Sequence, residues 1–293
     1  MSSAVLARRR ARRARWPVAA RYLLLAAGLV ITAAPFVWSV YIAVTDRVTG
    51  AGSILAFPNF TEAWRDGGFS TYTLTTVAYS LVTGLGATAV SALGGYAFGR
   101  LRFRGRRVLF AFLLSMAMIP GTVIVLPLFL VMIRFPLAGG NSIFGLGGSG
   151  FYNTFAGLVL PGFAVTTTIF LARQFFVGLP RDLEMAARID GASEWRIFTR
   201  VMLPLARPGL ITVFVLQFQD SWNAYLWPTV IANSQSLWTL QVGLESFQRL
   251  QAGSFGGIGS LQAGALLASV PIIVVFALAQ KTFRRGITIS GMQ

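Results

Sequence analysis

Hydrophobic residues gather into six long runs along the chain, and polar segments separate these runs. A helix that crosses a bilayer needs about 20 mostly apolar residues, because its backbone groups must bond to one another where no water is present. A transmembrane β-barrel would show short alternating segments instead. The pattern therefore predicts an all-α integral membrane protein with six transmembrane helices, at about 22–44, 74–97, 108–133, 154–176, 208–231 and 262–283.

The charged residues indicate how these helices cross the membrane. The net charge is +16, which in a soluble protein would suggest a nucleic-acid partner. Of the 25 basic residues, however, 21 lie in segments that fall on one side of the predicted membrane: 1–21, 98–107, 173–207 and 281–285. Basic loops stay on the cytoplasmic side. We therefore predict that both termini are cytoplasmic, and we expect the arginines to face membrane lipid and no nucleic acid.

The chain divides into three predicted parts. Residues 1–21 form an Arg-rich cytoplasmic N-terminus, residues 22–283 one transmembrane domain and residues 284–293 a cytoplasmic tail. A basic start followed by an apolar run is also typical of a cleaved signal peptide. The first run is longer than a usual signal-peptide core and lacks a clear small-x-small cleavage site. We therefore expect it to remain as a membrane anchor.

The residue types that usually perform enzyme chemistry are scarce. The chain has no His and no Cys, which excludes thiol nucleophiles, the usual zinc sites and imidazole acid–base catalysis. Its one lysine, Lys281, lies outside any GxxxxGK[ST] frame, so an ordinary P-loop is absent. The nine acids form no pair with an obvious catalytic context. We expect no enzymatic activity, cofactor or metal in this chain, and ATP-driven work would require a separate subunit.

The segment between the fourth and fifth runs is polar. It holds four of the nine acids: Asp182, Glu184, Asp190 and Glu194. The pattern predicts a short helix with an i,i+4 pair between Glu184 and Arg188 and a stop at Gly191. A second helix follows, with Ser193 as its N-cap and Pro204 as its limit. An amphipathic hairpin of this kind can also simply lie on a membrane surface.

The same segment resembles a known signature. The stretch EMAARIDGASEWRIFTRVMLP is similar to the EAA motif of ATP-binding-cassette (ABC) importer permeases. The residues in register are Ala186, Ala187, Gly191, Val201, Leu203 and Pro204. One position departs from the motif, because Met185 stands where the family usually has Glu, and Glu184 is one residue out of phase.

Other stretches extend the resemblance over roughly residues 70–293. GGYAFGRLRFRGRRVLF, SWNAYLWP and RRGITISGMQ resemble the corresponding stretches of sugar-importer permeases. The best match is the carbohydrate branch, in particular the subunit similar to the maltose-importer permease with a short N-terminus. This resemblance implies the type I ABC importer permease fold and a location in the plasma membrane of a prokaryote.

The resemblance also implies a mechanism and partners. A second permease subunit would complete a heterodimeric pore, an ATPase dimer would bind ATP and Mg, and an extracytoplasmic sugar-binding protein would deliver an oligosaccharide or disaccharide. The EAA coupling loop, residues 177–207, would dock on the ATPase and convert its closure into alternating access. The residues expected to take part in this coupling are Glu184, Met185, Ala186, Ala187, Asp190, Gly191, Ala192, Leu203 and Pro204.

The fifth run carries a polar stripe, because Gln217, Asp220 and Asn223 recur at intervals of three residues. Counted from Pro208 at about 1.5 Å per residue, Asp220 lies near the middle of a core about 30 Å thick. A carboxylate at that depth should face protein or water. The candidate substrate path therefore comprises Gln217, Asp220, Trp222, Asn223 and Tyr225. Bonds to neighbouring helices are the alternative role of these polar groups.

Two other functions remain open at this point. The cargo of an ABC permease could be another polar solute, such as a polyamine or a peptide. An ion-coupled secondary transporter could use Asp220 as its coupling carboxylate, although the sequence shows no repeated halves. The Gly-rich segment 134–153 could contact the binding protein or could be a surface connection.

Overall fold

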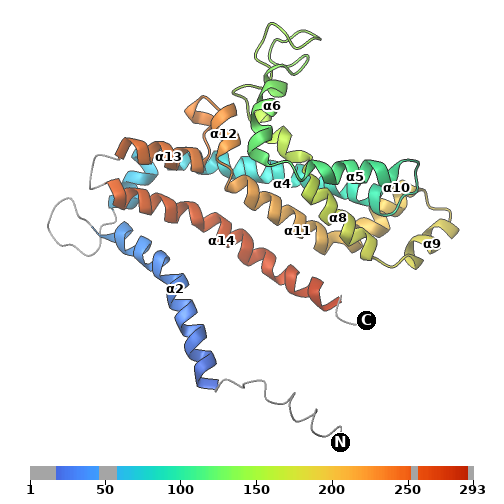
Figure 1. Cartoon of the computed structure of the whole chain (residues 1–293), viewed down its shortest axis with the longest axis horizontal. Helices are drawn as coiled ribbons and strands as arrows, with labels where there is room; N and C mark the ends of the chain where they lie inside the picture. The colour runs from blue at the N-terminus through green and yellow to red at the C-terminus, as the bar shows by residue number, and fades with distance from the viewer. Residues whose placement is uncertain (1–17, 46–57, 252–256, 290–293) are drawn as a thin grey trace, which may run out of the picture.

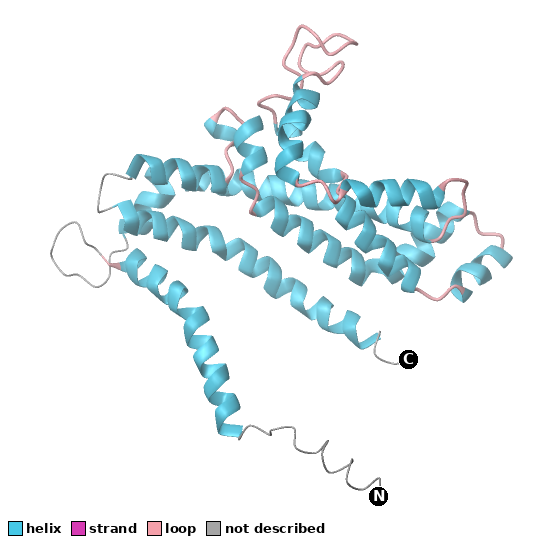
Figure 2. Ribbon diagram, in the orientation of Figure 1, coloured by secondary structure: helices cyan, strands magenta, loops and turns pink. Residues whose placement is uncertain are grey.

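The computed structural model describes residues 18–45, 58–251 and 257–289, and the side chains of the last helix as far as Leu278. The predicted Arg-rich segment therefore lies almost entirely outside the described residues. The side chains of Lys281 and of the arginines in the predicted tail also lie outside them. Within the described ranges every regular element is helical (Figure 2). The predicted all-α class is confirmed for this part of the chain.

Among the described residues, four helices are long and apolar enough to cross a membrane (Figure 1). They are α2 (Val18–Val44), α4 (Phe69–Gly99), the continuous helix Glu194–Trp222 and α14 (Gly257–Ile289). The third of these consists of α10 (Glu194–Arg196), a π-helical turn η3 (Ile197–Met202) and α11 (Leu203–Trp222). The count of spans rises to six if each of two bent helix pairs is one span.

The two bent pairs occupy the third and fourth predicted runs. The third run forms α5 (Arg106–Met116) and α6 (Gly121–Ile133), which meet at 104°. The fourth forms α7 (Phe155–Val159), a 3₁₀ turn η2 (Leu160–Phe163) and α8 (Thr166–Gly178), with a bend of 43°. Pro120 precedes α6, and proline disfavours helical geometry in the residue before it. The second bend follows η2, where Ala164 leaves the helical region at φ −115° and ψ 70°.

The fifth run differs at both ends from its predicted bounds of 208–231. Its helix already starts at Glu194, and it stops at Trp222. Pro204 does not end the second helix of the polar segment, because η3 runs directly into α11 and the helix continues through Pro204 to Trp222. The π-helical turn Ile197–Met202 lies immediately before α11. The helix Glu194–Trp222 therefore forms one rod from the polar segment into the bundle.

Short helices complete the described chain. They are α3 (Pro58–Thr61), η1 (Glu62–Asp66), α9 (Asp182–Ile189), α12 (Leu226–Ile231), η4 (Gln235–Leu237) and α13 (Leu240–Gln251). Of these, α9 lies at one end of the bundle, and α12 and α13 lie towards the opposite end (Figure 1).

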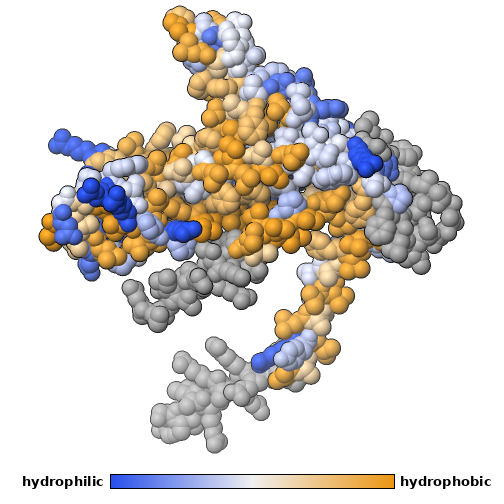
Figure 3. Space-filling view, turned by 180° about the vertical axis from the view of Figure 1, so that it is seen from behind, coloured by the Kyte–Doolittle hydropathy of each residue, from blue (hydrophilic) through white to orange (hydrophobic). Residues whose placement is uncertain are grey.

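Helix α4 is the centre of the bundle and packs against α8 and α11, while α11 also packs against α14. Small residues permit this approach. A Cβ on Gly95 would come within 2.8 Å of the backbone of Ala172, and one on Gly209 within 2.2 Å of the ring of Phe175. Hydrophobic residues cover the middle of the face seen in Figure 3, and hydrophilic ones gather towards its ends. This distribution suits a bundle surrounded by lipid.

Candidate functional site

The polar segment around α9 has the helix–glycine–helix form predicted for it. Gly191 adopts φ +76° after the end of α9, and the N–H of Ala192 donates to the carbonyl of Ala187 at 3.0 Å. Ser193 then caps the next helix by accepting from the N–H of Arg196. No atom lies within 4 Å of a Cβ built on Gly191. The left-handed backbone, and not crowding, is therefore what favours glycine at this position.

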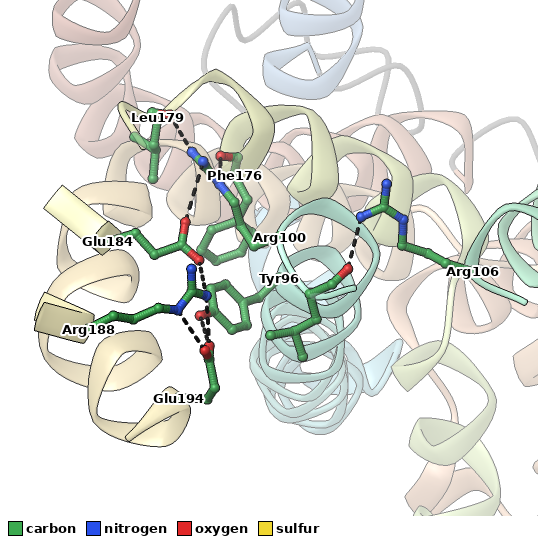
Figure 4. Close-up of polar contacts among 9 residues, drawn as sticks. Tyr96, Arg100, Arg106, Phe176, Leu179, Glu184, Arg188 and Glu194 are labelled. Carbon is green, nitrogen blue, oxygen red and sulfur yellow. Dashed lines mark hydrogen bonds and ion pairs between the residues drawn. The ribbon is translucent and has the colours of Figure 1, made fainter. Parts of the chain in front are cut away.

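A network of charged side chains ties α9 to the end of α4 (Figure 4). The Glu184 carboxylate is buried and lies between two arginines: Oε2 is 3.5 Å from Nη1 of Arg100, and Oε1 accepts from Nη2 of Arg188 at 2.9 Å. Arg188 also donates to Glu194, from Nε at 2.8 Å and Nη2 at 3.2 Å. The Tyr96 hydroxyl donates to Glu194 at 3.1 Å. The predicted pair of Glu184 with Arg188 is confirmed as one part of a larger network.

Arg100 is the buried cation of this network. It directly follows α4, and it donates from Nε to the carbonyl of Phe176 at 2.8 Å and from Nη2 to the carbonyl of Leu179. Burial lowers the pKa of the Arg100 guanidinium, but arginine stays charged over the whole range in which proteins are studied. In contrast, the hydrogen bonds to Glu194 raise the pKa of Arg188. Both arginines therefore remain cations that hold α9 in place.

An apolar cluster, here called the apolar floor, packs beneath these charged side chains. The buried side chains of Phe176, Ile197, Phe198 and Met202 form one cluster with Tyr96. The ring of Tyr96 is 5.0 Å from that of Phe198 and 5.7 Å from that of Phe176, measured between centroids. Helices α4, α8 and η3 thus supply one packed surface under the polar segment, so that it is held by burial as well as by charge.

The structure divides the predicted coupling residues into four groups. Met185, Ala186, Asp190 and Gly191 are exposed, and Ile189 beside them is 86% exposed. Glu184 points inward to the network instead, so its side chain does not belong to this exposed surface. The remaining residues are Ala187 and Ala192, which pack against the apolar floor, and Leu203 and Pro204, which line a separate groove.

That groove lies between α4 and α11. Its volume is about 500 Å³ and its lining is apolar apart from Thr88 and Arg207. The other lining residues are Leu85, Leu203, Pro204, Leu210, Ile211 and Phe214.

The candidate substrate path is also divided. Trp222 is 1% exposed, and its Nε1 donates to the carbonyl of Ala268 in α14 at 3.1 Å. Gln217 is buried and lies within 3.5 Å of the Ser221 hydroxyl. Both therefore belong to the packed interior, which corrects their placement on an open path. Trp222 is covered by α14, whereas Gln217 lies on another face of α11, close to Gly162 of η2.

Asp220, Asn223 and Tyr225 are exposed. The Asn223 amide donates to the carbonyl of Gln219 at 2.9 Å. Asp220 lies in the last turn of a helix that begins at Glu194, so it is close to an end of this rod. The depth counted from Pro208 therefore does not describe its place in the helix.

Sequence reasoning missed Tyr96 and Arg100, which hold the polar segment from another span. Both lie in the stretch GGYAFGRLRFRGRRVLF, where an arginine after an apolar run is explained equally well by membrane topology. A buried arginine and an exposed one have the same appearance in the sequence.

These features define a helical, multi-span membrane protein with a polar helix held firmly at one end. Residues 91–289 match the model of a family described as binding-protein-dependent transport system inner membrane component. The match covers more than half of the chain, which therefore belongs to this family.

Curated relatives agree with this assignment. The arabinooligosaccharides transport system permease protein AraQ of Halalkalibacterium halodurans is 33% identical over 242 residues, covering 82% of this chain and 81% of the relative. The trehalose transport system permease protein SugB of Mycobacterium tuberculosis is 32% identical over 239 residues, covering 80% and 81%. The relatives are carbohydrate ABC transport permease subunits and not enzymes.

A solved structure shares the fold. It is a bacterial ABC transporter involved in the import of the acidic polysaccharide alginate. The superposition has a TM-score of 0.73 at 23% identity and covers 89% of this chain and 94% of that one.

Proposed function

We propose that this chain is a transmembrane permease subunit of an ATP-driven, binding-protein-dependent importer of oligosaccharides or disaccharides. The observation that carries the proposal is the attachment of the polar helix α9 to α4 through Glu184 and Arg100. A short helix that must transmit force needs a stiff connection to a spanning helix. The proposal includes six spans, with each bent pair counted as one, and cytoplasmic N- and C-termini in a prokaryotic plasma membrane.

In this proposal α9 docks on a separate ATPase that binds ATP and Mg. The exposed residues Met185, Ala186, Ile189 and Asp190 form the contact surface. Closure of the ATPase dimer displaces α9, and the ion pair of Glu184 with Arg100 passes the displacement to α4. Such rigid-body transmission changes the permease from one access state to the other, provided that ATP and the loaded binding protein each favour one state.

Met185 gives the docking contact an apolar character. Its side chain is 51% exposed and its neighbour Ile189 is 86% exposed. Because Glu184 is already paired within the chain, it does not replace the missing Glu of the motif. Packing therefore contributes more to this contact than an ion pair does.

A second permease subunit completes the pore. The groove between α4 and α11 and the exposed apolar side chains along α4, such as Leu74 and Leu85, offer a surface for it. The exposed polar residues Asp220, Asn223 and Tyr225 lie at one end of α11, where they contact the hydroxyl groups of a passing sugar. An extracytoplasmic binding protein delivers that sugar.

The segment 134–153 is proposed as a contact for the binding protein. It projects beyond α6 in Figure 1, and Asn141 organises it by donating to the carbonyls of Ile133 and Phe135 and accepting from the N–H of Gly148. An ordered projection can present a surface to a partner.

Relatives named for arabinooligosaccharides and trehalose favour sugar over a polyamine or peptide as the cargo. Family membership argues against an ion-coupled transporter.

Purification of the tagged chain from its native membrane tests the proposal. We expect an ATPase subunit and a second permease to co-purify, and we expect sugar uptake into proteoliposomes to require ATP and the binding protein. Solute accumulation by this chain alone, driven by an ion gradient, would contradict the proposal.

A further inference from the structure

A second charged feature lies beside the coupling network, on the loop between α4 and α5. A hollow of about 460 Å³ is lined by Arg102, Phe103, Gly105, Arg106, Arg107 and Val108. Three arginines thus line one hollow, and no carboxylate does. Guanidinium groups form paired, charge-assisted hydrogen bonds with phosphate. The lining is therefore suited to a phosphate group.

The loop is held in shape by contacts that leave these arginines available. The Phe103 ring lies 6.0 Å from that of Phe98, between centroids. Arg106 donates from Nη1 to the carbonyl of Leu101 at 2.8 Å and lies apart from the network of Glu184 (Figure 4). None of the ion pairs among the described side chains involves Arg102, Arg106 or Arg107. These contacts hold Phe103 and Arg106, while the side chains of Arg102 and Arg107 are exposed.

An apolar surface begins where the arginines end. Helix α5 exposes Val108 by 73%, Leu109 by 52% and Phe112 by 64%, and it is the first half of a bent apolar span. A free phosphate would use only the arginines. A ligand with an anionic head and apolar chains would use both surfaces.

We propose that this hollow binds the phosphate of an anionic phospholipid, whose acyl chains lie along α5. A neighbouring hollow of about 720 Å³ shares Arg102, Phe103 and Arg106 but is also lined by Glu184 and Glu194. Those carboxylates repel an anion, so the phosphate belongs on the side of Arg107. The lipid site does not depend on the proposed ATPase coupling, although it lies on the loop that includes Arg100.

Native mass spectrometry of the full-length chain tests the site. The chain is released from detergent that contains phosphatidylglycerol and phosphatidylcholine in equal amounts. We expect the wild type to retain phosphatidylglycerol preferentially. The variant Arg102→Gln/Arg107→Gln should weaken this retention by about fivefold for each arginine removed, the factor that corresponds to about 1 kcal/mol per cationic side chain near an anionic surface. It leaves the bond of Arg106 to Leu101 in place.

Matched variants separate the site from general charge effects. Arg196→Gln/Arg200→Gln removes the same charge from exposed positions on α10 and η3 and should leave retention unchanged. Arg102→Lys/Arg107→Lys keeps the charge and should keep most of the preference for phosphatidylglycerol. Thermal unfolding of all variants checks that they are folded.

Several results would overturn the proposal. One is equal retention of both lipids by the wild type, and another is an equal loss in the two Gln double variants. Binding of inorganic phosphate without any preference for the anionic lipid would assign the arginines to a free anion. Lost association with an ATPase, together with unchanged lipid retention, would assign them to a protein interface.

Discussion

Nη1 of Arg100 lies 3.5 Å from Oε2 of Glu184, and both side chains are almost fully buried. Arg100 follows the spanning helix α4, whereas Glu184 lies in the first turn of α9. Glu184 also pairs with Arg188, and Arg100 also donates to two backbone carbonyls. Separating Glu184 from Arg100 would nevertheless break a buried ion pair, which is strongly unfavourable. The two helices are therefore expected to move as one body when a partner displaces α9.

Replacing Glu184 with Gln should uncouple α9 from α4. Loss of one partner of a buried ion pair costs about 3–5 kcal/mol, so we expect a lower unfolding temperature and strongly reduced sugar uptake while the ATPase still hydrolyses ATP. Uptake and ATP hydrolysis measured together in proteoliposomes check this. Asp182→Asn, an exposed change in the same turn, is the control. Equal behaviour of the two variants would refute the mechanical role of Glu184.

Replacing Arg100 with Lys should also weaken the connection although the charge is kept. Three different nitrogens of Arg100 contact two carbonyls and a carboxylate. The single ammonium of a lysine cannot reproduce this planar set of donors. We expect a reduced unfolding temperature and partial loss of uptake. A double-mutant cycle of Arg100→Lys with Glu184→Gln should be non-additive, whereas additive effects would show that the residues act independently.

Replacing Gly191 with Val should impair association with the ATPase while membrane insertion is retained. A β-branched residue at φ +76° is strained, at a cost of about 1–2 kcal/mol. Gly191→Asn should be close to wild type, because asparagine tolerates this conformation and no atom lies near the new Cβ. Co-purification of the ATPase measures both variants, and equal co-purification of Val and Asn variants would contradict the requirement for a left-handed residue.

Replacing Met185 with Lys should reduce ATPase binding, since it brings a charge into a contact formed by packing. Met185→Leu conserves volume and apolar character, so it should be tolerated. Affinity between the purified ATPase and the permease complex is the measurement. If the Leu variant binds as poorly as the Lys variant, the contact does not depend on apolar packing at this position.

Asp220 and Trp222 should respond differently to substitution. Trp222→Phe removes the donor to the Ala268 carbonyl and should lower stability by about 1–3 kcal/mol, with little change in the apparent KM for sugar. Asp220→Asn, at an exposed position, should change KM or uptake with little change in unfolding temperature. The opposite pattern would place Trp222 on the path and Asp220 in a structural role.

Local features of the polar segment could be predicted from the sequence. The pair of Glu184 with Arg188, the turn at Gly191 and the cap at Ser193 all join residues within four positions of one another. Their geometry follows from helix periodicity and from backbone preferences. That periodicity does not predict whether each of these residues is exposed or buried, because burial depends on what packs against the helix.

The sequence by itself determined that this is a helical membrane protein and where its apolar runs lie, because the cost of unsatisfied backbone groups in lipid acts on each run separately. Only the tertiary structure decided that Arg100 holds Glu184, that Trp222 lies beneath α14 while Asp220 is exposed, and that the chain bends between α5 and α6. These outcomes depend on contacts between residues distant in the chain and on packing at proline breaks. Local pattern carries no information about which distant surface meets which.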